Sequence, residues 1–273
     1  MPRIGASFYR QEIALTGYSF LTWEMLEPGI AHVRMARAPV NAVNQEMYVE
    51  LASLFSHPDL LGPDVKAVIL SGAGPHFCAG NDLDEFATMT PDNGVERMRQ
   101  VREGFFAIQE CPLPVIGAVH GVALGTGLAI AASCDFIVAA RDARFGLPEL
   151  TVGVMGGARH LARIVPQHVV RRMFFTGQPV SATELASTGG ALIVCDAECL
   201  LSEAVRHARY IAILSPTAVR LGKQVLNRIE SMDIRTGYEF EQGFTVKMSG
   251  HPDSKEALAA FREGRAAHYV PQK

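Results

Sequence analysis

The stretch VIGAVHGVALGTGLAIAASCD, from Val115 to Asp135, decides the fold of this chain. It begins as an apolar run rich in β-branched residues, passes through Gly121, Gly125 and Gly127, and continues as an Ala-rich run without Gly or Pro. β-Branched residues favour strands, glycine permits tight turns and alanine favours helices, so this order predicts a strand, a turn and a helix. The free N–H groups at the start of that helix suit an anion or a polarised carbonyl in the turn.

One such turn alone fits a helix that merely packs on a sheet, but a second glycine-rich turn lies upstream. The segment VKAVIL, residues 65–70, is typical of a buried strand and runs into SGAGPHFCAGNDL, residues 71–83. Each of the two strand-to-turn units can present a backbone N–H group to the same small space. Because two converging N–H donors form an oxyanion hole, the pair of turns predicts that kind of site.

Three segments in this order resemble one family. They are FCAGNDL (residues 77–83), AVHGVALGTGLAIAASCDFIVA (residues 118–139) and ARFGLPELTVGV (residues 143–154). They are similar to the crotonase superfamily, also called the enoyl-CoA hydratase/isomerase family, from about residue 30 to about residue 261. The resemblance implies an α/β protein with the crotonase (ClpP/crotonase-like) spiral of ββα units.

The same resemblance implies how the chain is divided. Residues 1–200 would form the spiral core with the CoA and acyl sites, and residues 201–273 a C-terminal helical region that mediates oligomerisation. Local patterns add further elements. They are hairpin strands 20–27 and 30–35, a helix 44–55 with Asn44 as N-cap, a helix 84–108 broken at 90–94, and an all-helical region from residue 197 onward. In the family, the segment 84–108 caps the acyl pocket.

Site residues follow by carrying the family motifs over position by position. The resemblance implies that the backbone N–H groups of Asn81 and Thr126 form the oxyanion hole. The family usually has Gly at the second position, so Thr126 departs from the pattern and narrows the room beside the donor. The flanking residues Ala79, Asp82 and Leu83 are implied to contact the substrate or its CoA portion.

Glu149 is the residue to which the resemblance assigns the chemistry. It follows Leu147-Pro148 in a segment rich in Gly and apolar residues, where burial would raise the pKa of a carboxyl group toward that of a useful base. Without the resemblance, a surface glutamate in a loop is the simpler interpretation. With it, Glu149 matches the family's downstream glutamate and is implied to be the catalytic acid or base.

The chain also departs from the sequence pattern of the family's hydratases at a second position. Those enzymes usually carry another glutamate where this chain has Ala129. Hydration is most simply run by two carboxylates, whereas one carboxylate suits the proton transfer of an isomerase. Some relatives with one matching glutamate still hydrate or cleave their substrates. The resemblance therefore implies an enoyl-CoA hydratase, which is a lyase, or an enoyl-CoA isomerase acting in fatty acid metabolism. The rival is a non-catalytic acyl-CoA-binding paralogue, which Ala129 favours and Glu149 opposes.

Three further residues are candidates for CoA binding. Arg37 and Ala38 resemble the family's adenine-side loop, although a solvated arginine is an equal alternative for the Arg37 side chain. Phe261 and Arg265 match a terminal family segment whose aromatic residue reaches the CoA of a neighbouring subunit. Because Gly264 replaces the lysine of that segment, Phe261 could instead simply pack between subunits.

The amino-acid composition limits which kinds of partner the chain can bind. The chain has 273 residues, of which 48% are apolar and 19% charged, and this low charge predicts that another subunit covers part of the surface. The resemblance implies a homotrimer or a dimer of trimers, that is, a hexamer. A formal net charge of −3 argues against a nucleic-acid surface. The expected partner is an acyl-CoA thioester, with CoA present only as part of the substrate.

Other classes are disfavoured by missing motifs. Gly125-Thr126-Gly127 continues to Ile130 and lies mid-chain, so it is not a dinucleotide fingerprint, and no G-x-S-x-G elbow is present. The five cysteines complete no metal-ligand pattern and are expected to be reduced core residues. We therefore expect no metal and no cofactor. The N-terminal residues show no signal-peptide pattern and no run is long enough to span a membrane, which favours a cytoplasmic protein without membrane contact.

Overall fold

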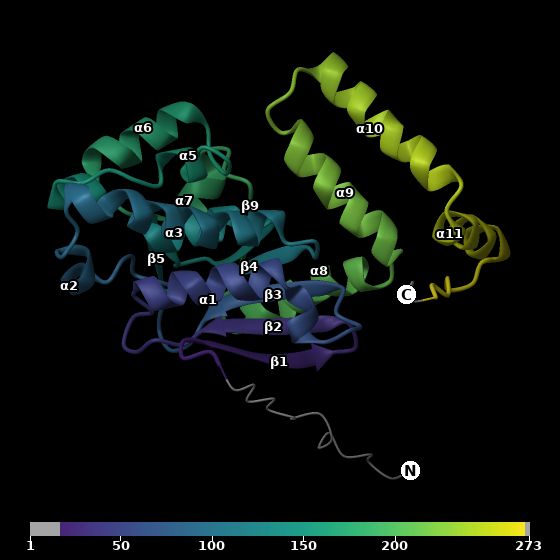
Figure 1. Cartoon of the computed structure of the whole chain (residues 1–273), viewed down its shortest axis with the longest axis horizontal. Helices are drawn as coiled ribbons and strands as arrows, with labels where there is room; N and C mark the ends of the chain where they lie inside the picture. Colours follow the sequence, from purple (N-terminus) through teal and green to yellow (C-terminus); the bar gives the residue numbers. More distant parts are fainter. Residues whose placement is uncertain (1–16, 271–273) are drawn as a thin grey trace, which may run out of the picture.

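A six-stranded sheet in the order β1-β2-β3-β4-β6-β9 lies at the centre of the computed structural model, which describes residues 17–270 (Figure 1). β1 pairs antiparallel with β2, and the remaining neighbours pair in parallel. The strands are β1 (Leu21–Glu27), β2 (Ile30–Met35), β3 (Ala67–Gly72), β4 (Val115–Val119), β6 (Phe136–Ala140) and β9 (Leu192–Cys195). The predicted hairpin is thus confirmed.

A second, smaller sheet in the order β5-β7-β8 gives the molecule its spiral. Its strands are β5 (Val122–Leu124), β7 (Arg144–Gly146) and β8 (Val180–Ser181). The chain passes from β4 to β5 and into helix α4 (Thr126–Ser133), and then from β6 to β7. After β3 it does the same, because Cys78 bridges in parallel to Ala123 of β5. This repeat of a strand in each sheet confirms the expected ββα spiral.

Helices cover both faces of the large sheet. The remaining α-helices are α1 (Gln45–Ser56), α2 (Leu83–Phe86), α3 (Pro91–Glu110), α5 (Ala158–Leu161), α6 (Gln167–Thr176), α7 (Ala182–Ser187), α8 (Leu200–Ala212), α9 (Pro216–Ile229), α10 (Ile234–Ser249) and α11 (Pro252–Glu263). The described residues also form three 3₁₀-helices, η1 (Pro58–Leu61), η2 (Glu149–Val152) and η3 (Ala197–Cys199). α1 and α3 lie side by side over one face, as Figure 1 shows.

Side chains along the strands point alternately to the two faces of the large sheet, and this produces two hydrophobic cores. On β3, Val68 and Leu70 belong to the core shared with α1 and α3, whereas Ala67 and Ile69 face α8. The face toward α8 is completed by Ala204 and other small residues of that helix. Because successive side chains of a strand point to opposite faces, a strand covered on both sides carries an unbroken apolar run, as β3 does from Ala67 to Leu70.

The break in the predicted helix 84–108 lies earlier than expected. Residues 87–90 separate α2 from α3, and α3 already begins at Pro91. The Thr90 side chain accepts a hydrogen bond from the Asn93 backbone N–H, and Asn93 Oδ1 accepts one from the Thr90 N–H. Since proline is favourable at the first helical position, Pro91 starts the helix that it was expected to interrupt.

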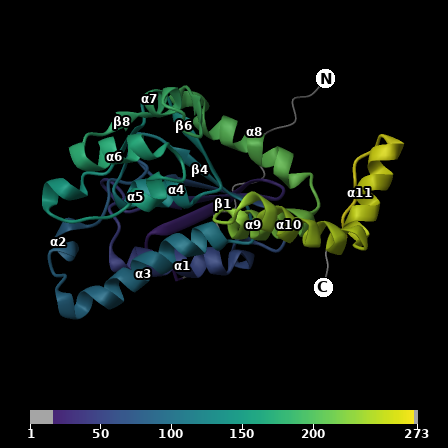
Figure 2. The same cartoon turned by 90° about the horizontal axis from the view of Figure 1, so that it is seen from above.

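The last three helices extend away from the sheets as an arm, α9–α11 (Figures 1 and 2). The first of the C-terminal helices, α8, packs on the large sheet instead, against β3 and β4. Along the arm several large apolar side chains are exposed, including Ile234, Val246 and Phe261. The division of the chain at residue 200 stays a prediction.

The cysteines only partly follow expectation. Cys78, Cys111 and Cys134 are buried free thiols, and burial raises the pKa of Cys78 to about 12. Cys195 is half-buried and Cys199 is exposed. Cys199 is therefore not a core residue, because it ends η3 at the surface, immediately before α8.

Candidate active site

A cleft of about 530 Å³ gathers most of the predicted site residues. Its lining includes Arg37, Ala38, Ala79, Asn81, Asp82, Leu83, Thr126 and Glu149. These residues come from the loops after β2, β3, β5 and β7. Because β2 runs parallel to β3, and β5 runs parallel to β7, the loops that follow each pair leave from the same edge. Phe261 is absent from this lining and lies on the arm, where its side chain is 85% exposed.

Two backbone N–H groups at the cleft are free. The bridge between Val43 and Asn81 uses the N–H groups of Val43 and Asp82, with Gly80 and Val43 as acceptors, and leaves the Asn81 N–H unused. Thr126 is the first residue of α4, where an N–H has no partner within the helix. Within residues 17–270, neither N–H donates a hydrogen bond. Both are available to bind a carbonyl or anionic oxygen.

Close backbone approach explains the glycines beside these groups. A β-carbon at Gly127 would lie 2.2 Å from the Cys78 carbonyl oxygen, so any larger residue would push the two turns apart. Gly125 has a φ of +52°, and a β-carbon there would lie 2.8 Å from Glu149 Oε1. The missing side chain at position 125 thus lets the Glu149 carboxylate approach the turn before α4.

Glu149 starts η2 and presents a carboxylate in an unusual state. Its Oε2 atom is buried and has no hydrogen-bond partner among the described residues. Burial raises the pKa of Glu149 above its usual value of 4.5, against a smaller opposing effect of a backbone hydrogen bond. A carboxylate whose pKa is raised is a stronger base than an exposed glutamate, which suits proton transfer.

A family model described as enoyl-CoA hydratase/isomerase matches residues 26–272. The chain belongs to the enoyl-CoA hydratase/isomerase family. The matched residues include the helices, the small sheet, the turns at the cleft and the large sheet from β2 onward, whereas β1 begins before them.

Relatives of known name carry different activities. The chain is 38% identical over 227 residues to a (7aS)-7a-methyl-1,5-dioxo-2,3,5,6,7,7a-hexahydro-1H-indene-carboxyl-CoA hydrolase of Mycobacterium tuberculosis, covering 82% of this chain and 90% of that protein. It is 34% identical to a short-chain-enoyl-CoA hydratase of Clostridium acetobutylicum, covering 83% of this chain and 88% of that protein. A crystal structure of an enoyl-CoA hydratase from Bacillus anthracis superposes with a TM-score of 0.86 at 28% identity, covering 93% of this chain and all of that one.

The position of the second family glutamate is apolar and enclosed. Ala129 is 1% exposed in α4 and does not line the cleft. Besides Glu149, the carboxylates of the lining are Asp82 and Asp84. Asp84 is exposed, and the Asp82 carboxylate is engaged in an ion pair and a helix cap. Among the cleft carboxylates of the described residues, Glu149 is the one with an oxygen atom, Oε2, that is buried and has no hydrogen-bond partner.

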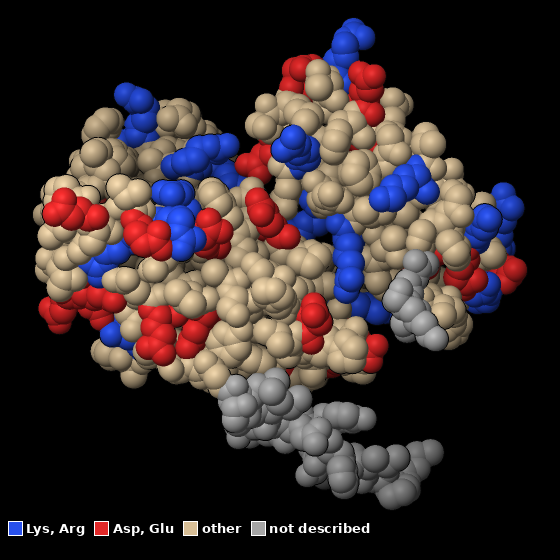
Figure 3. Space-filling model, in the orientation of Figure 1, with Lys and Arg blue, Asp and Glu red and all other residues tan. Residues whose placement is uncertain are grey.

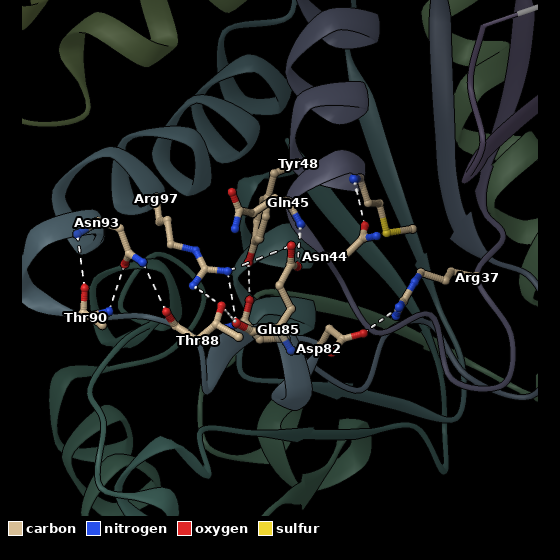
Figure 4. Close-up of polar contacts among 12 residues, drawn as sticks. Arg37, Asn44, Gln45, Tyr48, Asp82, Glu85, Thr88, Thr90, Asn93 and Arg97 are labelled. Carbon is tan, nitrogen blue, oxygen red and sulfur yellow. Dashed lines mark hydrogen bonds and ion pairs between the residues drawn. The ribbon is translucent and has the colours of Figure 1, made fainter.

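Arg37 is held in place rather than solvated. Its guanidinium pairs with Asp82 Oδ2 (Figure 4). It also donates to the Ala42 carbonyl at 2.9 Å and lies over the Phe20 ring. Asp82 Oδ1 also accepts from the Glu85 N–H, and this bond, together with Arg37, lowers the pKa of Asp82. The pair ties the loop after β2 to the turn that carries Asn81.

Polar contacts also fix the segment between α2 and α3. Arg97 of α3 donates to the Glu85 carbonyl and to Thr88 Oγ1, both at 3.0 Å, and the Glu85 carboxylate accepts from the Gln45 N–H of α1 (Figure 4). Leu83 and Phe86 of α2 line the cleft. This wall of the cleft, which was expected to cap the acyl pocket, is therefore held by hydrogen bonds to both α1 and α3.

One residue of the site escaped the sequence analysis. Tyr48 of α1 is buried beside the cleft, and its hydroxyl contacts both Asn81 and Thr126. The available signal was its place one residue after Met47 on the apolar face of the predicted helix. A buried tyrosine needs a partner for its hydroxyl, but the sequence does not say which.

Neither a membrane span nor a metal cluster is found in the described part. Between residues 17 and 270, no helix combines the length and apolarity needed to cross a bilayer. No group of three or more His, Cys, Asp or Glu side chains in that range could hold a metal ion. On the face shown in Figure 3, basic and acidic side chains are interspersed.

Proposed function

We propose that this chain is an acyl-CoA enzyme in which Glu149 transfers a proton and the backbone N–H groups of Asn81 and Thr126 stabilise the enolate. The observation that carries the proposal is the half-buried carboxylate of Glu149 beside the Gly125 turn, whose Oε2 atom is buried without a hydrogen-bond partner. The thioester carbonyl would lie between the two N–H groups. Its CoA portion would follow Arg37, Ala38, Ala79, Asp82 and Leu83, which line the same cleft.

The chemistry needs one base. Glu149 takes a proton from the α carbon of a 3-enoyl-CoA, and the electron pair of the broken C–H bond moves onto the thioester oxygen. The protonated Glu149 returns the proton to the γ carbon, which shifts the double bond without changing the mass. Since Ala129 offers no second carboxylate, isomerisation is the reaction that the geometry supports best. Hydration stays a second outcome and would require another acid or base.

A hydrolase is a further candidate because relatives at 38% and 37% identity are named as hydrolases of a dioxo-indene-carboxyl-CoA. The same three groups support that chemistry. A thioester carbonyl held by the two N–H donors becomes more electrophilic, and Glu149 can deprotonate the water that attacks it. Collapse of the tetrahedral adduct would break the C–S bond and release the CoA thiolate, which takes the proton from Glu149. The substrate would then be a cyclic acyl-CoA that carries ketone groups.

Product mass spectrometry in heavy-oxygen water separates these reactions. Purified protein is incubated with a 2-enoyl-CoA, a 3-enoyl-CoA and a cyclic oxo-acyl-CoA, each beside a Glu149→Gln control. A shifted double bond without heavy oxygen indicates an isomerase, and one labelled water added across the double bond indicates a hydratase. A product carboxylate that contains heavy oxygen, formed from the cyclic substrate and from neither enoyl-CoA, indicates a hydrolase. If the protein bound all three substrates without forming any product, the proposal of an enzyme would be contradicted. The chain would then be a non-catalytic acyl-CoA-binding paralogue.

The assembly belongs to the same proposal. We place the exposed apolar residues of the arm against a second and third copy of the chain, with Phe261 near a neighbour's CoA site. A homotrimer, or a dimer of trimers, is the expected state. The cytoplasmic location and the independence from metals and cofactors stay predictions.

A further inference from the structure

Tyr48 joins the two residues of the cleft lining whose N–H groups donate no hydrogen bond among the described residues. Its hydroxyl lies 2.7 Å from Asn81 Oδ1 and 2.8 Å from Thr126 Oγ1. Asn81 and Thr126 are far apart in the sequence and come from different turns of the spiral. One hydroxyl group on α1 thus connects the loop after β3 to the start of α4.

The direction of the hydrogen bonds follows from the number of protons. Asn81 Oδ1 can only accept, so the single proton of the Tyr48 hydroxyl is donated to it. The Thr126 hydroxyl must therefore donate to Tyr48 Oη. The resulting chain runs from Thr126 through Tyr48 to Asn81 and has one polarity. Burial raises the pKa of Tyr48 well above its usual value, so this hydroxyl stays protonated.

The Tyr48 ring is itself held rigidly between two helices. It makes an edge-to-face contact with Phe105 of α3, with ring centroids 5.9 Å apart. Gly104 leaves the room for this contact, because a β-carbon there would lie 3.1 Å from Tyr48 Cδ1. A side chain fixed in this way can fix its own hydrogen-bond partners.

We propose that Tyr48 is a positioning residue that sets the spacing of the two oxyanion donors through the side chains of Asn81 and Thr126. This inference rests on the proposed function. It also gives a reason for threonine at position 126, where the family usually has glycine, because only a hydroxyl there completes the bridge. The bridge matters most when negative charge develops on the thioester oxygen, since donors already in place need no reorganisation.

The test combines turnover with a spectroscopic readout of the donors. Tyr48→Phe removes both hydrogen bonds and keeps the ring. We expect kcat to fall roughly tenfold with KM within about twofold, because the loss acts on the transition state rather than on CoA binding. In infrared spectra of bound butyryl-CoA labelled with carbon-13 at the thioester carbonyl, wild type lowers the carbonyl frequency and Tyr48→Phe loses much of that shift.

Two comparisons separate positioning from general stability. Tyr18→Phe removes another tyrosine hydroxyl that bonds to α1, 2.9 Å from Ser53 Oγ, but Tyr18 does not line the cleft. This variant should keep the wild-type kcat and carbonyl shift. At position 126, Thr126→Val should lower kcat and reduce the carbonyl shift more than Thr126→Ser does, because serine keeps the hydroxyl.

The outcomes distinguish this inference from the proposed function. A Tyr48→Phe enzyme with wild-type kcat and an unchanged carbonyl shift would overturn the positioning role. Equal losses in Tyr18→Phe and Tyr48→Phe would do the same, since the effect would then be one of stability. A wild-type protein that shifts no carbonyl frequency would instead remove the oxyanion site, and with it the proposed function.

Discussion

At the scale of single residues, Glu149 has the environment expected of the base that we propose it to be. Its carboxylate oxygen is buried without a partner, which is unfavourable for folding and favourable for proton transfer. Sequence reasoning reached Glu149, Asn81 and Thr126 because each occupies a fixed place in a motif. It did not reach Tyr48, whose role depends on two residues distant in the sequence.

The same burial predicts a pH-dependent effect on stability. Since the pKa of Glu149 is raised in the folded state, its ionised form destabilises the fold at pH 7, and this penalty disappears as the pH falls through the raised value toward 4.5. Glu149→Gln should therefore raise the melting temperature at pH 7, by roughly 2–4 °C. The difference from wild type should narrow toward pH 4.5. Calorimetry across this range measures it, and an equal gap at every pH would contradict the assignment.

At the scale of elements, local signals were sufficient where a cap or an alternation marks the boundary. The Asn44 side chain accepts from the Met47 N–H and caps α1, as expected. The hairpin β1–β2 also follows its alternating pattern. Short strands were not predictable, because β5, β7 and β8 contain only two or three residues and so have no period to detect.

An ion pair between a buried lysine and a partly exposed aspartate attaches the arm to the sheet. Lys223 of α9 donates to Asp135 Oδ2 at 2.7 Å and to the Leu113 carbonyl at 3.0 Å. Lys223→Met would leave the partly exposed Asp135 carboxylate with the Val115 N–H as its partner and should lower the free energy of unfolding by about 1.5 kcal/mol. Denaturant titration measures this, with Lys255→Met on exposed α11 as the control, expected within about 0.5 kcal/mol of wild type. A Lys223→Met protein as stable as the control would show that the pair does not attach the arm.

At the scale of the whole molecule, the spiral could not be derived from composition or periodicity. Those properties predict alternating strands and helices, but the passage between two sheets depends on pairings such as Cys78 with Ala123. The family motifs supplied the spiral and, with it, the convergence of the loops on one cleft. The outward direction of the arm was beyond local patterns, since it depends on how α9 packs on the body of the molecule.

The arm predicts self-association. Ile234 is 90% exposed and Val246 73% exposed on α10, and a single chain leaves both in water. Analytical ultracentrifugation of wild type should show three or six chains. Ile234→Asp combined with Val246→Asp should shift the protein toward monomers, whereas Glu241→Gln on the same helix should not. Monomeric wild type at assay concentrations would rule out the proposed assembly.

Removal of deuterium from the α carbon tests the central claim most directly. A 3-enoyl-CoA deuterated at the α carbon is incubated in ordinary water with wild type and with Glu149→Gln, after equal binding of both has been confirmed by calorimetric titration. The account predicts that wild type removes deuterium from the α carbon, which reaches the γ carbon or the solvent, and that Glu149→Gln does so at least a hundredfold more slowly. Removal by Glu149→Gln at close to the wild-type rate would show that another group is the base.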